Sequence, residues 1–158
     1  SVKDQFAGKG SLFADGRWSV HDNNKRVIYT SLEAETAFGE ALSAVRYYGF
    51  PDSRAAPLVF VTGNVQLSRV IDMRVGKVRQ QLKISNGAIC ETDWRLENSN
   101  GQQSFTQACG RAFAESGVEG FIVPSAAWRQ GCNLIVFPEN LEPKSRIEVI
   151  REINWPRP

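Results

Sequence analysis

The stretch Val27–Leu42, VIYTSLEAETAFGEAL, determines how the rest of the chain is interpreted. Its first four residues, Val27–Thr30, are β-branched or aromatic, which is typical of a short strand. From Leu32 to Tyr48, apolar residues recur at the spacing of a helix face, which predicts an amphipathic helix with that face in the core. Tyr29 and Glu40 then lie on either side of one strand–helix junction. We expect this junction to face a ligand.

The ends of the predicted helix carry their own signals. Thr30 and Ser31 can both cap a helix N-terminus, and Glu33 follows Thr30 by three residues, so a capping box is available. At the other end, Gly49 followed by Pro51 is typical of a helix stop. The sequence therefore predicts a helix with defined ends, directly after a strand.

Length and composition indicate an ordinary globular protein. The chain has 158 residues, of which 42% are apolar and 23% charged, and we expect one domain over residues 1–158 with loosely ordered ends at 1–9 and 154–158. The net charge of +2 is too small to favour nucleic acid or a membrane surface as a partner. There is neither an apolar run long enough to span a bilayer nor a signal-peptide pattern at the start.

The cysteines and the single histidine favour neither a metal centre nor a disulfide framework. Cys90, Cys109 and Cys132 are scattered and odd in number, which predicts free thiols in a reducing cytoplasm. His21 lies in a polar turn, where we expect it to be solvated rather than catalytic. The chain has no dinucleotide fingerprint, phosphate loop, HExxH or GxSxG motif. We therefore expect a site without histidine or metal.

The remaining elements mix strands and helices without regular alternation. Residues 1–18 are predicted as a loop with one short helix at most, and residues 21–24 as a turn. The predicted strands cover residues 57–62 (a buried one), 69–73, 120–124, 133–137 and 146–153. The predicted helices cover residues 74–84 and 103–116, and the segment 85–100 is expected to be irregular, with Trp94 as its anchor. This order predicts an α+β fold with a mixed sheet and flanking helices rather than a doubly wound parallel sheet.

Four residues are candidates for chemistry: Arg17, Tyr29, Glu40 and Ser125. Each also has an ordinary interpretation, as a surface charge, strand packing, a solvated carboxylate or a turn residue. Two features favour a site. Gly16-Arg17-Trp18 puts a planar cation beside an aromatic ring, which suits a phosphate and a flat heterocycle. Ser125 follows the end of a buried strand, where ligands commonly bind.

Five stretches, in this order along the chain, resemble the RES-domain family, which is named for an Arg, a Glu and a Ser. They are Gly16–Trp18 (GRW), Val27–Ser31 (VIYTS), Thr36–Glu40 (TAFGE), Gly120–Ala126 (GFIVPSA) and Gly131–Phe137 (GCNLIVF). The segment Asp93–Arg95 and the helix after Gln103 also resemble the middle of the family. The likeness covers nearly the whole chain, from about Gly10 to Leu141. Each stretch is loose alone, but their common order is fairly specific.

The resemblance implies a fold similar to that of ADP-ribosyltransferases and a toxin of a bacterial toxin–antitoxin pair. Such toxins deplete NAD+ by cleaving its nicotinamide–ribose bond, by hydrolysis or phosphorolysis, with NAD+ as substrate and no metal. The resemblance assigns catalysis to Glu40, Arg17, Tyr29 and Ser125. It assigns ligand binding to Arg17, Trp18, Tyr29, Ser31, Ser125 and Asn133. In this interpretation Glu40 stabilises the charged ribose and Arg17 binds the pyrophosphate. Tyr29 lies near the nicotinamide, and Ser125 hydrogen-bonds a ribose or a phosphate.

The partner and the cellular setting are also implied by the resemblance. An antitoxin or immunity protein, of the Xre helix-turn-helix type, is expected to cover the active cleft in the bacterial cytoplasm, although the chain could also be a domain of a delivered effector. Two alternatives stay open: a mono-ADP-ribosyltransferase that modifies a protein, and a nucleotide-binding subunit without turnover.

The chain departs from the family pattern at two points. Ser19 follows Trp18 where many members have Asn. An aromatic–Arg pair that often precedes the GRW would lie before Ser1, so either the site lacks a phosphate ligand or an upstream segment completes it.

Overall fold

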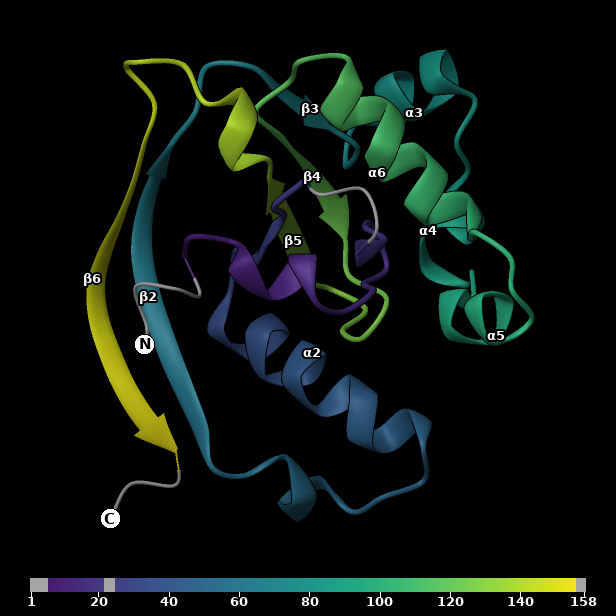
Figure 1. Ribbon diagram of the computed structural model, residues 1–158, viewed down its shortest axis with the longest axis vertical. Coiled ribbons are helices and arrows are strands. Elements are labelled where there is room, and N and C mark those ends of the chain that lie inside the picture. The colour runs from purple at the N-terminus through teal and green to yellow at the C-terminus, as the bar shows by residue number, and fades with distance from the viewer. Residues whose placement is uncertain (1–5, 22–24, 156–158) are drawn as a thin grey trace.

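Strands from both halves of the chain form one four-stranded sheet. The computed structural model describes residues 6–21 and 25–155. In it, β1 (Ile28–Ser31), β5 (Cys132–Val136) and β4 (Gly120–Pro124) are successive antiparallel neighbours. Strand β3 (Val70–Asp72) completes the order β1-β5-β4-β3 and runs parallel to β4 (Figure 1). This mixed sheet with its flanking helices confirms the predicted α+β class, and all four strands lie within two residues of their predicted bounds.

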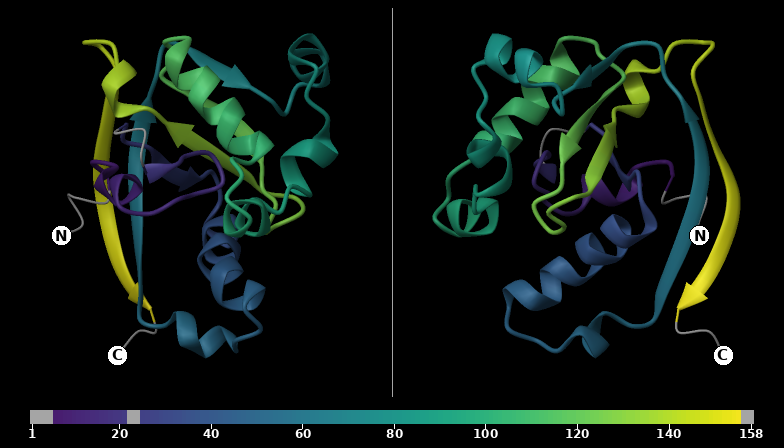
Figure 2. Two further views of the ribbon diagram at one scale, coloured as in Figure 1. Left: turned by 45° about the vertical axis from the view of Figure 1, so that its right-hand side comes forward. Right: turned by 180° about the vertical axis from the view of Figure 1, so that it is seen from behind.

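A separate two-stranded ribbon forms one side of the molecule. Strand β2 (Leu58–Gln66) pairs antiparallel with β6 (Arg146–Trp155), with a register shift between Thr62 and Gly63. Both views in Figure 2 show this ribbon as a long curved arm beside the sheet. The prediction of a buried strand at 57–62 is wrong, because a ribbon with only two strands leaves alternate side chains in solvent.

Helices cover the opposite side. Helix α2 (Ala34–Tyr47) follows β1 directly, and α3 (Gly76–Leu82), α4 (Asn86–Cys90), α5 (Trp94–Ser99) and α6 (Phe105–Glu115) come from the middle of the chain (Figure 1). The 3-10 turns η1 (Lys9–Leu12), η3 (Asp52–Ala55) and η4 (Pro138–Asn140) lie in the connections. The segment 85–100 is therefore helical in two short pieces and not irregular. Ser85 and Asp93 cap these pieces by accepting hydrogen bonds from Ala88 and Leu96 N–H.

The predicted capping box at the start of α2 is absent. The N-cap is Glu33, which makes no side-chain cap, and its Oε2 instead accepts hydrogen bonds from the Thr36 hydroxyl and the Cys132 N–H, at 2.8 and 3.0 Å. These two bonds lower the pKa of Glu33. The carboxylate thus ties α2 to the first residue of β5. The end of α2 is as predicted, with Gly49 at a φ of 72°.

The buried face of α2 differs from the predicted one, and α6 also buries polar residues. In α2 the buried line is Thr36, Gly39 and Leu42, and most of the predicted apolar stripe is only half-buried or exposed. In α6 the buried residues include Thr106, Gln107 and Gly110, whereas Phe105 is exposed. Small and polar residues fill these faces because other backbone segments approach the helices closely. A Cβ added to Gly110 would lie 2.0 Å from the Trp18 carbonyl oxygen.

The main core gathers aromatic and aliphatic side chains between the sheet and the helices. Phe121 of β4 is fully buried and contacts three rings, those of Trp18, Phe113 and Phe137, with centroids 4.9 to 5.8 Å apart. A smaller cluster around Ile28, Leu134 and Val136 covers the other face of the sheet, with Val65 and Ile147 of the ribbon packed against it. The two clusters fix β1 and β5, from which the site is built.

A fully buried carboxylate joins the start of β4 to two connections. Glu119 accepts hydrogen bonds from the N–H groups of Ser68, Arg69 and Glu142, and the last two are 2.8 and 2.7 Å long. Burial alone would raise the pKa of Glu119, but these hydrogen bonds outweigh it and lower the pKa to about 2. Glu119 is therefore ionised in the folded protein and holds the β3–β4 end of the sheet together.

Some predicted features fall at the ends of the chain or in its first turn. Residues 1–5, 22–24 and 156–158 lie outside the described part, and so does most of the predicted 21–24 turn. Asn154 and Trp155, expected in a loose tail, belong to β6. The three cysteines are free thiols.

Candidate active site

A cleft of about 1910 Å³ lies between the ribbon, β1, α2 and the N-terminal segment. Its walls include Arg17, Tyr29, Ser31, Glu40 and Asn133 of the predicted set. These five residues are spread over more than a hundred positions of sequence, and the fold brings them to one surface. The cleft is thus the candidate active site.

Glu40 is held from behind through one of its two carboxylate oxygens. Its Oε1 accepts hydrogen bonds from Ser125 Oγ at 2.7 Å and from Asn133 Nδ2 at 2.6 Å. Its Oε2 has no hydrogen-bond partner among the described residues. The carboxylate therefore has one fixed oxygen and one that is available to a ligand in the cleft.

The partners of Glu40 are themselves fixed. Ser125 Oγ accepts hydrogen bonds from the Ala127 and Trp128 N–H groups, at 3.1 and 3.0 Å. Asn133 Oδ1 accepts from Ser31 Oγ at 2.7 Å, across the register pair that joins β1 to β5. Strand geometry accounts for this contact, because side chains directly opposite each other on antiparallel strands share a face.

Ser125 does not line the cleft. It is 4% exposed, and its hydroxyl makes the three hydrogen bonds just described. The expectation that it binds a ribose or a phosphate directly is therefore wrong. Its contact with Glu40 makes it a positioning residue instead.

Arg17 extends from the N-terminal segment to the other side of the cleft. Its Nη1 donates to the carbonyl oxygens of Ile89 and Thr92, at 3.1 and 2.9 Å, at the end of α4. Burial lowers the pKa of Arg17, and the charge of Glu40 acts in the opposite direction. The described residues provide no hydrogen-bond partner for Nε or Nη2, so part of the planar fork stays available for an anion.

Tyr29 lies on the same face of β1 as Ser31, two residues away. Its hydroxyl accepts a hydrogen bond from Trp18 N–H at 3.0 Å and shares one with Ser19 Oγ at 2.9 Å. Loss of contact with water raises the pKa of Tyr29 to about 12, in spite of these bonds. A Cβ on Gly16 would lie 2.4 Å from the hydroxyl, so glycine is needed for this approach. Tyr29 thus offers its half-exposed ring, not its hydroxyl, to the cleft.

The Trp18 ring occupies the core and not the ligand side of the cleft. It is 4% exposed and packs edge-on against Phe121. The prediction that this ring offers its plane to a flat heterocycle is wrong. Its side chain anchors the segment from which Arg17 projects.

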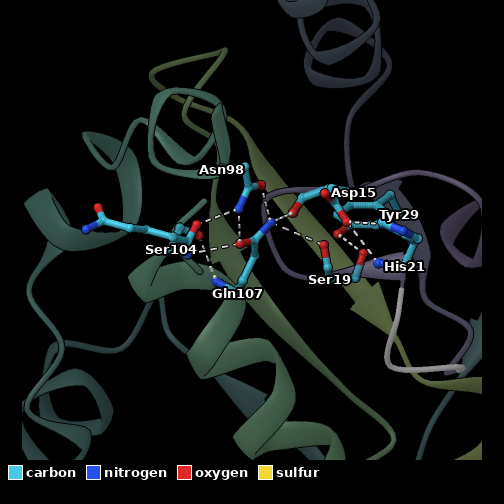
Figure 3. Close-up of polar contacts among 9 residues, drawn as sticks. Asp15, Ser19, His21, Tyr29, Asn98, Ser104 and Gln107 are labelled. Carbon is cyan, nitrogen blue, oxygen red and sulfur yellow. Dashed lines mark hydrogen bonds and ion pairs between the residues drawn. The ribbon is translucent and has the colours of Figure 1, made fainter. Parts of the chain in front are cut away.

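A buried amide network fixes that segment from the other side (Figure 3). Gln107 Nε2 donates to the carbonyl oxygens of Gly16 and Ser19, at 3.0 and 3.4 Å, and to Asn98 Oδ1 at 2.8 Å. Gln107 Oε1 accepts from Ser104 N–H, which closes the capping box of α6. The Ser104–Gln107 spacing is a capping-box signal in the sequence. Its link to Gly16 is a tertiary contact that no local pattern contains.

Among the cleft-wall residues outside the predicted set are Tyr47 of α2 and Trp94 and Arg95 of α5. The Arg95 guanidinium lies 5.0 Å from the Tyr47 ring centroid and 4.5 Å from that of Trp94. The two carboxylate oxygens of the neighbouring Asp93 accept hydrogen bonds from the Tyr47 hydroxyl, at 3.0 and 3.1 Å. The sequence predicts Trp94 as an anchor and indicates no role for Arg95.

Other chemistry finds less support in the described part of the chain. His21 is exposed, with its Nδ1 2.8 Å from Asp15, and lies outside the residues that line the cleft. Within residues 6–21 and 25–155, no group of three or more His, Cys, Asp and Glu side chains is placed to hold a metal ion. The helices in the same ranges are too short or too polar to cross a membrane.

Comparison with known proteins agrees with this geometry. The family model described as RES domain matches residues 1–157. The chain belongs to the RES domain family. None of the curated proteins compared with it gives a match. Among solved structures, it is similar to a chain of the M. tuberculosis MbcT–MbcA toxin–antitoxin complex, with a TM-score of 0.74 and 21% identity. The match covers 93% of this chain and 75% of that one.

Membership confirms the family resemblance drawn from the sequence. The structural match shows that the chain shares its fold with that chain of the MbcT–MbcA complex. Of the residues that the resemblance assigned to the site of this RES domain, all but Ser125 are among those that line the cleft. The Trp18 ring nevertheless packs into the core, and the buried Ser125 lies behind Glu40.

Proposed function

We propose that this RES domain binds NAD+ in the cleft and cleaves its nicotinamide–ribose bond, which makes the chain an NAD+-consuming toxin. The main support is the Glu40 carboxylate, whose Oε1 is fixed by Ser125 and Asn133 and whose Oε2 has no partner within residues 6–21 and 25–155. Membership of the RES family supports the choice of substrate.

The chemistry requires charge stabilisation more than proton transfer. As the bond between C1′ of the ribose and the nicotinamide nitrogen breaks, its electron pair leaves with the nicotinamide and neutralises the pyridinium. Positive charge develops on the ribose, as in the oxocarbenium-like transition states of glycoside hydrolysis. A carboxylate oxygen beside the ribose stabilises that charge, and we assign this role to Glu40 Oε2. A water or phosphate oxygen then bonds to C1′, and a water loses its proton to solvent.

The other residues position the substrate. The unpartnered part of the Arg17 fork binds the diphosphate, which fixes the dinucleotide along the cleft. The exposed ring of Tyr29 packs against the nicotinamide end, close to β1. Ser31 has an indirect role, because its hydrogen bond orients the Asn133 amide toward Glu40. No group in this scheme has to act as a strong general acid, since neutral nicotinamide is a good leaving group.

The test measures release of free nicotinamide from NAD+ by the purified chain. Glu40→Gln keeps the shape of the side chain but removes its charge, and we expect a loss of about 10²- to 10³-fold, typical of removing a key electrostatic group. Glu35→Gln, on an exposed position of the same helix, is the matched control and should keep the parent rate. Parent-like release by Glu40→Gln would refute the mechanism.

The products separate the alternative functions. Hydrolysis gives free ADP-ribose and phosphorolysis gives ADP-ribose 1″-phosphate. A protein transferase would instead leave labelled ADP-ribose on a protein target, and a binding subunit would release no nicotinamide at all.

We also infer that a partner of antitoxin type covers the cleft in the cell. The support is the likeness to a chain of the MbcT–MbcA toxin–antitoxin complex. An Xre-type partner is the form that the resemblance implied. Co-expression with the neighbouring reading frame, followed by purification of the complex, tests this inference. Protection of Arg17 and Glu40 from solvent in hydrogen-exchange measurements on their backbone segments is the expected result.

A further inference from the structure

Arg95 is a cation of the cleft wall whose side chain is ordered by packing on aromatic rings. Its guanidinium packs over two aromatic rings, that of Tyr47 from α2 at 5.0 Å and that of Trp94 at 4.5 Å. The side chain is half-buried, and all three residues line the cleft. Stacking on two rings orders a side chain that would otherwise have many rotamers.

No carboxylate neutralises Arg95 among the described residues. The adjacent Asp93 accepts the Tyr47 hydroxyl and caps α5 through the Leu96 N–H. Another arginine of the same wall, Arg46, differs in this respect, because Asp52 binds it through two hydrogen bonds of 2.8 and 2.7 Å. Arg95 thus has a fixed position and donors without an anionic partner.

Arg17 and Arg95 line the same cleft, so two like charges share one site. Burial is the main cause that lowers the pKa of Arg17, and the charge of Arg95 lowers it further. Two cations directed into one cleft, neither with an ion-pair partner in the described part of the chain, form a site in which an anion with two charges relieves the repulsion. A diphosphate has two charged groups, one for each guanidinium group of the clamp.

We propose that Arg95, stacked between Tyr47 and Trp94, forms with Arg17 a two-arginine clamp for the diphosphate of a dinucleotide. The clamp makes the cleft select dinucleotides over mononucleotides that carry the same reacting end. This proposal rests on the proposed function for the identity of the substrate, but the clamp itself is defined by its affinity for diphosphate.

The experiment measures direct binding of ADP and of AMP to the whole chain by calorimetry at low salt. We expect the parent to prefer ADP, and Arg95→Gln to weaken ADP binding at least about tenfold, the size of one charge-assisted contact, with little change for AMP. Arg95→Lys keeps the charge but not the planar fork, so its affinity for ADP should lie between those of the parent and Arg95→Gln. Arg54→Gln is the matched control, because Arg54 is also stacked on a ring, that of Phe50 at 4.5 Å, and lies outside the cleft wall.

A second measurement keeps this proposal separate from the proposed function. Cleavage of NAD+ is compared with cleavage of nicotinamide mononucleotide, which has the same reacting bond and one phosphate. The clamp predicts that Arg95→Gln raises KM for NAD+ but not for the mononucleotide. ADP binding that depends on Arg95, without any nicotinamide release, would support the clamp and refute the proposed function. Unchanged ADP affinity and an unchanged KM for NAD+ in folded Arg95→Gln would overturn the clamp. Equal weakening of ADP and AMP would overturn it as well.

Discussion

The two hydrogen bonds to Glu40 Oε1 give a quantitative prediction for the proposed reaction. Ser125→Ala and Asn133→Ala each remove one donor, at 2.7 and 2.6 Å respectively. A hydrogen bond to a charged group contributes about 1.5–3 kcal/mol. If that amount is lost from the transition state, kcat for nicotinamide release falls about 10- to 100-fold for each variant.

Asn133→Asp is the more stringent perturbation. Asp has the shape of Asn but puts an acceptor where the donor now lies, 2.6 Å from Glu40 Oε1. Two carboxylates at that distance repel each other, so one must take up a proton or move away. We therefore expect a larger loss of kcat than for Asn133→Ala, although the substitution leaves no cavity.

Loss of stability has to be separated from loss of the carboxylate's position. Ser125→Ala also leaves the Ala127 and Trp128 N–H groups without their acceptor, which costs about 1–2 kcal/mol of folding free energy. Glu119→Gln is the control, since it weakens the far end of β4 and is not part of the cleft wall. It should lose stability and keep kcat. Parent-like kcat in a folded Asn133→Asp variant would refute the role assigned to Glu40.

Three further predictions concern the framework around the site. Glu119 has a pKa of about 2 in the folded protein against an ordinary 4.5, so its contribution of about 3 kcal/mol to the free energy of unfolding is complete above pH 4.5 and disappears as the pH falls toward 2. Glu119→Gln should flatten this acid dependence in urea unfolding, and an unchanged pH profile would contradict the prediction. Gly131→Ala places a Cβ 1.8 Å from Thr36 Oγ1 and should cost about 1–3 kcal/mol in thermal unfolding; it should recover in part with Thr36→Ala, and a parent-like Tm would show that the contact is relaxed without cost. Tyr29→Phe removes the acceptor of the Trp18 N–H and should cost about 1 kcal/mol of folding free energy at pH 7. Because folding raises the pKa of Tyr29 to about 12, the parent protein loses stability as the pH rises above 10, and the difference between parent and variant should shrink there.

The strands of the central sheet were predictable because their signals are local. β4 and β5 are short apolar runs bounded by Gly, Pro or a turn, and each has the length of a buried strand. The ribbon strand β2 has the same kind of sequence, and the wrong prediction of its burial has a physical cause. Whether an apolar run is covered on both faces depends on what packs against it, and β2 pairs only with the distant β6.

The short helices and the helix faces show a second limit. Helices α4 and α5 span five and six residues, too few for a helical apolar period to be recognised. In α2 the buried positions Thr36 and Gly39 face the connection between β4 and β5: a Cβ built on Gly131 would lie 1.8 Å from Thr36 Oγ1, and a Cβ built on Gly39 would contact Trp128 at 3.5 Å. Apolar spacing alone therefore selected the wrong face.

The candidate site was predictable as a set of residues but not as a set of contacts. Arg17, Tyr29 and Glu40 were chosen partly because their residue types suit an anion, a ring and a cationic sugar, and they line one cleft. The bonds that give the site its geometry join residues 85 and 93 positions apart, so no local spacing contains them. The error on Trp18 has the same origin, because its neighbour Arg17 points into the cleft while its own ring enters the core.

The segment Gly16–Ser19 explains why a site without histidine can still be rigid. Its successive side chains have different surroundings: Arg17 lines the cleft, Trp18 packs in the core, and Ser19 hydrogen-bonds the hydroxyl of Tyr29. Gln107 holds its backbone from the opposite side, so the segment is fixed in three directions (Figure 3). A group that stabilises charge has to be in place before the charge develops, since reorganisation during the reaction would consume the gain. Fixed hydrogen bonds on Glu40 and a fixed backbone under Arg17 meet that requirement with neutral donors alone, without the titrating groups on which general acid–base catalysis depends.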